Sequence, residues 1–317
     1  MKILLTGVAS FTGFWIARSL VAQGHRIVAP LDRGRAEYDG LDRQRLERLS
    51  PRVQTVDHCR FGSPGFLGLL ENGEFDLLCQ HGAHYVPDGD APDSNVRVAF
   101  RADTLNLGDV LDRGRRKPGF AVILSGTVAE QNEGRGTYPR VALSPAAQAQ
   151  SMTADAFRFW CRNLGVKLAK FVVPEPFGPY EDANLCDRLV RAWAEGTSAT
   201  IEAAAETRDY IHVSLLAAAY ADLVARLEKL PAWSRLGPSL YAETEAEFAQ
   251  RLALEIGGRL QLGCPLAFAT PSAVPAPKVR INTDSLDHAW LGWNEQKAWD
   301  ELADYYRGHI LQQRAAS

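Results

Sequence analysis

A short stretch near the N-terminus, Thr6 to Gly13, has the composition of a phosphate-binding turn. It follows an apolar run and precedes an amphipathic segment, so we expect it to join a strand to a helix. Gly7 can adopt the dihedral angles of a tight turn, and Gly13 allows the helix to pack closely against the strand. Backbone N–H groups at the start of that helix could then bind a pyrophosphate. The same residues could also form a structural connection that binds no ligand.

Ser10 departs from the usual pattern of this turn, which has a glycine at the middle position. A serine keeps the backbone N–H group but places a Cβ atom near the phosphate, so we expect weaker or differently angled binding. The residues that we expect to contact the cofactor at this turn are Gly7, Ser10, Phe11, Thr12 and Gly13.

An acidic residue, Asp32, ends the next apolar run, nineteen residues after Gly13. This is close to the ~20-residue spacing of the acidic side chain that hydrogen-bonds the adenosine ribose of NAD. Arg33 and Arg35 follow immediately and could instead pair with the 2′-phosphate of NADP. The sequence therefore predicts NAD or NADP as the cofactor and leaves the choice between them open.

Apolar runs alternate with amphipathic segments through the first half of the chain, as in repeated strand–helix units. We therefore predict the α/β class, with a doubly wound parallel sheet of Rossmann type. The expected strands are 2–6, 26–31, 53–57, 75–80, 121–125 and 168–173. The expected helices are 14–23, 102–111, 155–164, 215–230, 248–256 and 296–311, and the charged run 42–48 predicts a solvated helical face.

A cluster of turn-forming residues after position 173 indicates a domain junction: Pro174, Pro176, Gly178 and Pro179. We expect residues 1–173 to form a dinucleotide-binding domain, joined by residues 207–230. Residues 174–206 and 231–317 would then form a smaller C-terminal substrate-binding lobe. Within that lobe, residues 263–277 contain four prolines and no charged residue, which predicts a loop.

The composition argues against several classes of function. The chain of 317 residues has 35 Lys and Arg against 38 Asp and Glu, a net charge of -3, so no basic field attracts nucleic acid or an anionic membrane. The N-terminal apolar run is too short for a membrane span or a signal peptide, which favours a cytoplasmic protein. The five cysteines lack Cys-x-x-Cys spacing, so we expect reduced, mostly buried thiols and no metal site.

Several motifs together resemble the extended short-chain dehydrogenase/reductase family, the NAD-dependent epimerases and dehydratases of nucleotide sugars. The resemblance covers nearly the whole chain, and its more specific motifs are the glycine-containing turn and the string Arg-Asp-Tyr-Ile-His-Val at 208–213. Weaker matches lie at 103–107, 174–179 and 291–293. The resemblance implies a Rossmann-like fold with a small lobe, bound NAD or NADP, a nucleotide-sugar-like substrate and a homodimer.

The resemblance also implies a catalytic set that this chain has only in part. The family uses a Ser or Thr after the fifth strand to orient the substrate, and Thr127 matches it, within Ser125-Gly126-Thr127. It also uses a Tyr-x-x-x-Lys pair, in which Tyr transfers a proton and Lys lowers the pKa of Tyr. Ala146 and Gln150 stand at those two positions, and neither side chain titrates. Loss of such acid–base catalysis typically costs ~10²–10⁴ in rate.

Several other side chains are candidate substitutes for the missing pair. Tyr138 lies eight residues before Ala146, and His84 and Tyr85 follow the fourth strand, but such loop residues more often have packing roles. Glu130 and Glu133 follow Thr127 at a strand end, and we expect both to be exposed charges.

Two residues are candidates for substrate binding. Arg208 matches the arginine with which relatives bind the diphosphate of the sugar nucleotide, and the alternative is an ion pair with Asp209 or another carboxylate. Glu175 stands where relatives commonly have Asn, so it adds a negative charge to the expected pocket. We expect His212 to be a hydrogen-bonded structural histidine, and Tyr180 and Trp293 to be packing residues.

Two functions remain open from the sequence. One is an NAD(P)-dependent enzyme acting on a nucleotide-linked sugar or a similar polyol, with its proton transfer reassigned to other residues. The other is a catalytically inactive relative that binds dinucleotide or nucleotide sugar as a sensor, a scaffold or a partner subunit.

Overall fold

The computed structural model describes residues 1–83, 92–269 and 279–316. Its backbone divides into two compact units. The first unit comprises Met1–Glu133, Pro139–Val173 and Ala217–Gly237. The second comprises Gly134–Tyr138, Pro174–Leu216 and Pro238–Ser317.

These boundaries differ from the sequence-based division at three segments, and strand pairing explains each difference. Residues 207–216 belong to the second unit because β10 (Thr207–His212) pairs with β8, β13 and β15 of that unit. Residues 231–237 belong to the first unit because β11 (Trp233–Leu236) pairs with β7 in the large sheet. Residues 134–138 carry β6 (Arg135–Gly136), which pairs with β15 of the second unit.

The first unit is built on a parallel sheet, in which seven described strands follow the order β11-β7-β5-β4-β1-β2-β3. These strands are β1 (Lys2–Leu5), β2 (Arg26–Pro30), β3 (Val53–Val56), β4 (Leu77–Gln80), β5 (Ala121–Thr127), β7 (Lys167–Val173) and β11. Side chains such as Ile3, Leu78 and Val122 are completely buried, as expected for strands covered on both faces. The predicted α/β class and doubly wound parallel sheet are confirmed.

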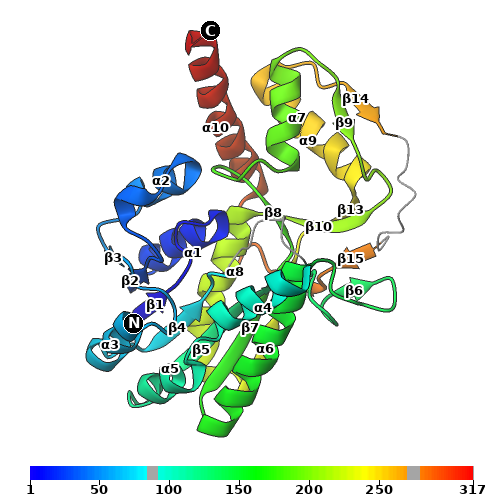
Figure 1. The fold of residues 1–317 in the computed structure, drawn as a ribbon. Helices are drawn as coiled ribbons and strands as arrows, with labels where there is room; N and C mark the ends of the chain where they lie inside the picture. The colour runs from blue at the N-terminus through cyan, green and yellow to red at the C-terminus, as the bar shows by residue number, and fades with distance from the viewer. Residues whose placement is uncertain (84–91, 270–278, 317) are drawn as a thin grey trace. The chain divides into compact units, whose positions relative to one another are not determined.

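Helices cover both faces of this sheet (Figure 1). On one face α3 (Pro64–Gly73) packs against α5 (Leu107–Gly114), α5 against α6 (Pro145–Leu164), and α6 against α4 (Pro92–Asp103). Tyr220 of α8 (Val213–Arg226) packs on Phe171 of β7 from the opposite face, with ring centroids 4.9 Å apart. The remaining helices of the first unit are α1 (Phe11–Ala22), η1 (Arg35–Glu37), α2 (Gly40–Glu47) and η2 (Leu227–Lys229).

Three helix predictions need correction. The expected helix 102–111 is two helices, because Asn106 adopts a left-handed backbone (φ 50°) between α4 and α5. The helix expected at 155–164 begins ten residues earlier, where the Ser144 hydroxyl accepts the Ala147 N–H group and Pro145 occupies the first turn. In α2, Arg45 is not solvated but completely buried, and its guanidinium donates to the Ala9 carbonyl oxygen.

The second unit is built on β10, which pairs with β8 (Glu175–Phe177), β13 (Tyr241–Thr244) and β15 (Val279–Ile281). Its helices are α7 (Leu185–Ala194), α9 (Glu245–Leu260) and α10 (Glu295–Ala316). An aromatic core that includes Phe177, Phe248 and Trp299 packs between them. The short strands β9 (Ala199–Ile201) and β14 (Leu266–Phe268) pair with each other, as do β12 (Pro238–Ser239) and β16 (Asp284–Ser285), so residues 266–268 are a strand and not the loop that we expected.

The cysteines are free thiols, as predicted. Cys59, Cys79, Cys161 and Cys186 are buried, and Cys264 is half-buried. Each helix in the described ranges is too short or too polar to cross a membrane.

Candidate functional site

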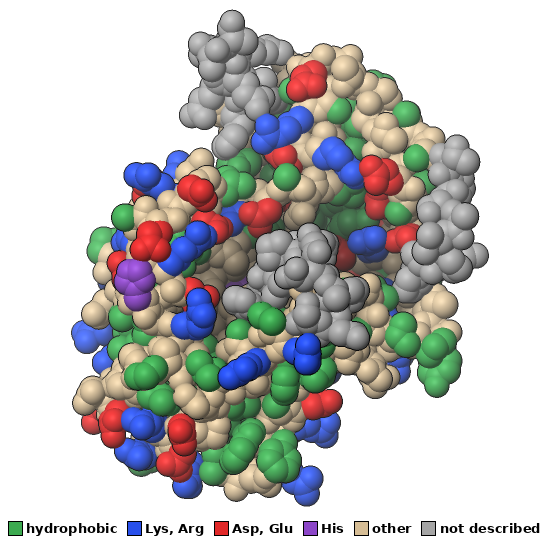
Figure 2. Space-filling view, viewed as in Figure 1, with side chains coloured by type: hydrophobic (Ala, Val, Ile, Leu, Met, Phe, Trp, Pro, Cys, Tyr) green, Lys and Arg blue, Asp and Glu red, His purple; other side chains and the backbone are tan. Residues whose placement is uncertain are grey.

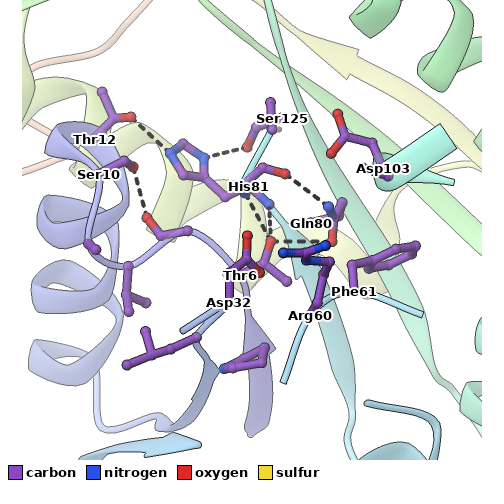
Figure 3. Close-up of a pocket in the computed structure, with 18 of the residues that line it drawn as sticks. Thr6, Ser10, Thr12, Asp32, Arg60, Phe61, Gln80, His81, Asp103 and Ser125 are labelled. Atoms are coloured by element: carbon purple, nitrogen blue, oxygen red, sulfur yellow. Dashed lines mark hydrogen bonds between the residues drawn. The ribbon is translucent and has the colours of Figure 1, made fainter. Parts of the chain in front are cut away.

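A cavity of about 410 Å³ opens in the first unit at the carboxyl ends of its central strands (Figure 3). The strand order reverses between β1 and β4, and open α/β sheets bind ligands in the crevice at such a point. The cavity is lined by residues of the turn before α1, by the residues that follow β2, β3 and β4, and by the end of β5.

The turn before α1 requires its two glycines. Gly7 has φ 75°, and a Cβ atom there would lie 2.7 Å from the backbone of Gly82. A Cβ atom on Gly13 would lie 2.0 Å from the Gly7 carbonyl oxygen. Any larger side chain at either position would therefore displace the backbone that lines the cavity.

Ser10 is the N-cap residue of α1. Its hydroxyl donates to the Gly7 carbonyl oxygen at 2.8 Å and accepts the Gly13 N–H group at 3.2 Å. The next two N–H groups, of Phe11 and Thr12, belong to the first helical turn and have no intrahelical acceptor. N–H groups at a helix N-terminus and the positive end of the helix dipole favour an anion, and Thr12 is among the residues that line the cavity.

Asp32 and the two arginines that follow it have different surroundings. Asp32, two residues after the end of β2, is exposed and lines the cavity. The Arg33 guanidinium lies over the ring of Tyr38, 4.3 Å from its centroid, and Arg35 donates to the Leu46 carbonyl oxygen at 2.6 Å. Neither arginine is among the residues that line the cavity, whereas Arg60, after β3, is among them.

A hydrogen-bonded array crosses the inner wall of the cavity (Figure 3). His81 follows β4, and its Nε2 atom lies 2.8 Å from the Thr12 hydroxyl. Its Nδ1 atom lies 2.7 Å from the Ser125 hydroxyl. Burial lowers the pKa of His81 to about 4, so the imidazole is neutral at pH 7. The sequence reasoning missed His81, although its position at a strand end on the ligand-binding edge was a usable signal.

Thr6 fixes the backbone around His81. The Thr6 hydroxyl accepts the N–H groups of His81 and Gly82, at 3.0 and 2.9 Å, and donates to the Gln80 Oε1 atom at 3.2 Å. The Gln80 amide in turn donates to the Gly82 carbonyl oxygen. This closed set of hydrogen bonds holds the segment after β4 in one conformation.

The positions that correspond to the family's catalytic residues are only partly brought together. Thr127 and Gln150 line the cavity, whereas Ala146 is exposed near the start of α6 and is not a lining residue. Tyr138 is 85% exposed and belongs to the second unit. The two other candidate substitutes, His84 and Tyr85, lie outside the described residues.

The prediction that Glu130 and Glu133 are exposed is wrong for both side chains. Glu130 is 1% exposed, and the buried Lys170 ammonium lies 2.5 Å from Glu130 and 2.8 Å from Glu133. Burial raises the pKa of Glu130 despite the nearby ammonium. For Glu133, burial opposes ionisation but Lys170 and Arg235 outweigh it, so its pKa is lowered. This network could not be predicted from the sequence, because Lys170 lies within an apolar run.

Glu130 also contacts the backbone of the cavity. Its Oε1 atom accepts the Thr127 N–H group at 2.7 Å. A Cβ atom on Gly126 would lie 2.1 Å from that Oε1 atom and 2.7 Å from the Lys170 side chain. The Glu130–Lys170 pair therefore supports the segment that carries Thr127.

A second cavity, of about 300 Å³, lies wholly within the second unit and contains both predicted substrate-binding residues. Arg208 on β10 lies 2.7 Å from Glu206 and 3.4 Å from Glu175. Asp209 is not its partner, because the Asp209 carboxylate accepts the N–H groups of Leu240 and Asn282. Burial raises the pKa of Asp209 to about 6.

The remaining aromatic candidates have structural contacts in the second unit. His212 is hydrogen-bonded through Nδ1 to the Ser214 hydroxyl, as predicted, and the Trp293 indole N–H donates to the same hydroxyl. The Tyr180 ring packs edge-on against Tyr305. Within the described ranges, no three His, Cys, Asp or Glu side chains form a group that could hold a metal ion.

Solved structures share this fold across the whole chain. UDP-glucose 4-epimerase from Thermotoga maritima, solved with UDP-glucose, is 17% identical, with a TM-score of 0.70 over 98% of this chain and 100% of that one. UDP-glucuronic acid 4-epimerase from Bacillus cereus, solved as a mutant with NAD, is 15% identical, with a TM-score of 0.73 over 99% and 100%. The dTDP-glucose 4,6-dehydratase DesIV from Streptomyces venezuelae, with NAD bound, is 16% identical, with a TM-score of 0.69 over 97% of each chain.

No protein-family model and no curated protein matches the sequence. At these identities the likeness to solved structures establishes the fold, which is the fold implied by the resemblance in the sequence.

Proposed function

We propose that the first unit binds NAD and that the protein is an NAD-dependent oxidoreductase acting on a hydroxyl or keto group of a small polyhydroxylated substrate. The observation that carries this proposal is the 410 Å³ cavity, which combines the N-terminus of α1 with an acidic side chain after β2. Neighbours of the same fold are NAD complexes, which supports the choice of cofactor.

The residues of the cavity fit the parts of the cofactor. The N–H groups of Phe11 and Thr12 at the start of α1 would bind the pyrophosphate, and the carboxylate of Asp32, which lines the cavity, would accept hydrogen bonds from the adenosine ribose. We propose NAD over NADP because Asp32 lines the cavity, whereas Arg33 is held against Tyr38. A 2′-phosphate would meet the Asp32 carboxylate at that position, with Arg60 as the nearby cation.

NAD, when bound, exchanges a hydride with the substrate carbon, so the protein must supply the path for the proton. We propose that Thr127 orients the substrate and that Ser125 receives the proton of the substrate hydroxyl. Ser125 would pass its own proton to the Nδ1 atom of His81, while the Nε2–H group donates to Thr12. A base with a pKa of about 4 is weak at pH 7, so we expect slow turnover.

A second candidate function is that of a catalytically inactive relative that binds the dinucleotide. The specific observation in its favour is that Ala146 and Gln150 replace the Tyr and Lys of the family. The two candidates share the same cofactor cavity and differ only in whether a proton is transferred.

A redox assay separates these candidates. NADH formation or consumption is followed by absorbance with a panel of sugars and sugar nucleotides, for the native protein and for Thr127→Ala and His81→Phe. The enzyme predicts slow turnover that both substitutions reduce, and Ala146→Tyr with Gln150→Lys should raise it by up to ~10²–10⁴. Turnover that is absent from the native protein and arises only in this double variant would favour the inactive relative.

The substrate and the oligomeric state are further proposals. Neighbours are complexes with UDP-sugars, which supports a sugar as the substrate, whereas Arg208, which we expected to contact a diphosphate, already faces Glu206 and Glu175. We also propose a homodimer that buries α6, because Phe159 and Trp160 on this helix are 59% and 39% exposed. Sedimentation of the native protein and of a Phe159→Glu variant tests this, and a monomeric native protein would contradict it.

A further inference from the structure

The cavity of the second unit has an excess of carboxylates over cations. Its lining includes four glutamates, Glu175, Glu181, Glu202 and Glu245, and two arginines, Arg188 and Arg208. Figure 2 shows basic and acidic side chains alternating over the part of the second unit that carries α7 and α9. A diphosphate requires the opposite balance of charges, since it carries negative charge itself.

Both arginines are already engaged by carboxylates. Arg208 lies between Glu206, at 2.7 Å, and Glu175, at 3.4 Å. Arg188 lies 3.3 Å from Glu202. A diphosphate that reached Arg208 would lie beside these carboxylates, and repulsion between the like charges would weaken binding.

Glu245 is a carboxylate of this cavity that has no cationic partner in the described part of the chain. It is 7% exposed at the first position of α9, and the N–H group of Ala203 donates to it at 3.4 Å. Glu181 is also buried, but it accepts the Tyr306 hydroxyl and burial raises its pKa to about 8. Because Glu175 and Glu202 face arginines and Glu181 accepts a hydroxyl group, Glu245 is the buried carboxylate of the cavity that is available to a cationic ligand group.

The Tyr210 hydroxyl is the second polar group that the cavity leaves open. The ring is 5% exposed and stacked on Phe248, with centroids 3.8 Å apart. Its hydroxyl is buried and has no hydrogen-bond partner among the described residues. A buried hydroxyl without a partner is costly, so a ligand atom that hydrogen-bonds to it would be stabilising.

We propose that the cavity of the second unit binds the ammonium group of an amino-bearing polyol, with Glu245 as the anionic partner and the Tyr210 hydroxyl hydrogen-bonded to the ligand. This ligand site lies wholly within the second unit and goes beyond the function proposed for the first unit. The ammonium group of the ligand would lie beside the buried Glu245 carboxylate. A hydroxyl group of the ligand would form a hydrogen bond with the Tyr210 hydroxyl. A nucleoside diphosphate is disfavoured at the same position, because the arginines are paired.

Calorimetric titration of the full-length protein at pH 7 tests this proposal. The probes are glucosamine, its neutral counterparts glucose and N-acetylglucosamine, and UDP-glucose as the diphosphate. We expect glucosamine to bind at least about tenfold more tightly than the two neutral sugars, because a charge-assisted hydrogen bond typically contributes that much.

Two variants and a matched control assign the binding to this cavity. Glu245→Gln should weaken glucosamine binding about tenfold to a hundredfold, and Tyr210→Phe about tenfold, since Phe keeps the stack on Phe248. Glu247→Gln is the matched control, because it makes the same change at an exposed position of α9. Gln can replace Glu in the capping box at the start of this helix, so glucosamine binding should be unchanged.

Three results would overturn the proposal: UDP-glucose binding more tightly than glucosamine, equal binding of glucosamine and glucose, or an unchanged affinity in Glu245→Gln. The affinity for NAD is measured with the same proteins. This measurement distinguishes failure of the ammonium-site proposal from failure of the proposed function. The NAD cavity contains none of the substituted residues, so its affinity should be the same in all variants.

Discussion

Replacing Lys170 by Met tests the buried ion-pair network that supports Thr127. The Lys170 ammonium lies 2.5 Å from the carboxylate of Glu130, which is 1% exposed. Methionine fills a similar volume and removes the charge that offsets the burial of Glu130. Breaking a buried pair in this way typically costs about 3–5 kcal/mol of unfolding free energy.

Protonation of Glu130 sets an upper limit on the part of this loss that comes from its unpaired charge. The ordinary pKa of the carboxyl is 4.5, so taking up a proton at pH 7 spans 2.5 pH units. At about 1.36 kcal/mol per unit, the cost is about 3.4 kcal/mol. We therefore expect Lys170→Met to lose about 3 kcal/mol at pH 7.

The loss should also depend on pH. Between pH 4.5 and 7, Glu130 of the folded Lys170→Met variant retains a proton that the unfolded chain has released. The unfolding free energy of the variant therefore falls as the pH rises. At pH 5.5 Lys170→Met should lose about 1.4 kcal/mol of unfolding free energy, because this pH is one unit above the ordinary carboxyl pKa of 4.5.

Urea unfolding of the native protein and of Lys170→Met, at pH 5.5 and at pH 7, measures both quantities. Lys170→Met combined with Glu130→Gln should recover about 1–2 kcal/mol at pH 7, because no carboxylate is then buried without its cation. A loss below about 1 kcal/mol at pH 7, or the same loss at both pH values, would refute this reasoning.

Three further predictions follow from the two units. Asp32→Asn should weaken NAD binding about tenfold and narrow the preference for NAD over NADP, as measured by fluorescence titration with both cofactors. Burial raises the pKa of Glu181 to about 8, so between pH 4.5 and 8 this carboxyl keeps its proton in the folded protein and loses it in the unfolded chain. The unfolding free energy should therefore fall as the pH rises from 4.5 to about 8. Urea titrations of Glu181→Gln should show that this pH dependence is lost. The His81 ring should remain neutral down to a midpoint near pH 4 in an NMR titration, and a midpoint near 6.5 would show that the ring is not buried.

The parallel sheet could be predicted because its strands are buried on both faces, which makes them continuous apolar runs such as 121–125. The break between α4 and α5 could not be predicted from periodicity. Asn106 donates to the Gly62 carbonyl oxygen at 2.9 Å, and Gly62 closely approaches the backbone of Leu105. A contact between residues 44 positions apart leaves no local pattern in the sequence.

Local spacing in the sequence leads to part of the cavity lining. Gly7, Ser10 and Thr12 of the turn before α1 and the acidic side chain Asp32 line the cavity, whereas Phe11 and Gly13 are not among its lining residues. His81 and Lys170 were missed because their partners, such as Ser125 and Glu130, are about 40 residues away along the chain. Pairings of this kind depend on strand order, which spacing alone does not give.

Titration of the purified protein with NAD tests the central claim of this account most directly. We predict binding with Kd below about 1 mM, tighter for NAD than for NADP, and abolished in Gly13→Val, whose fold is checked by circular dichroism. Absence of binding for both dinucleotides at millimolar concentration, with the native protein folded, would contradict the claim that the turn before α1 is a pyrophosphate site.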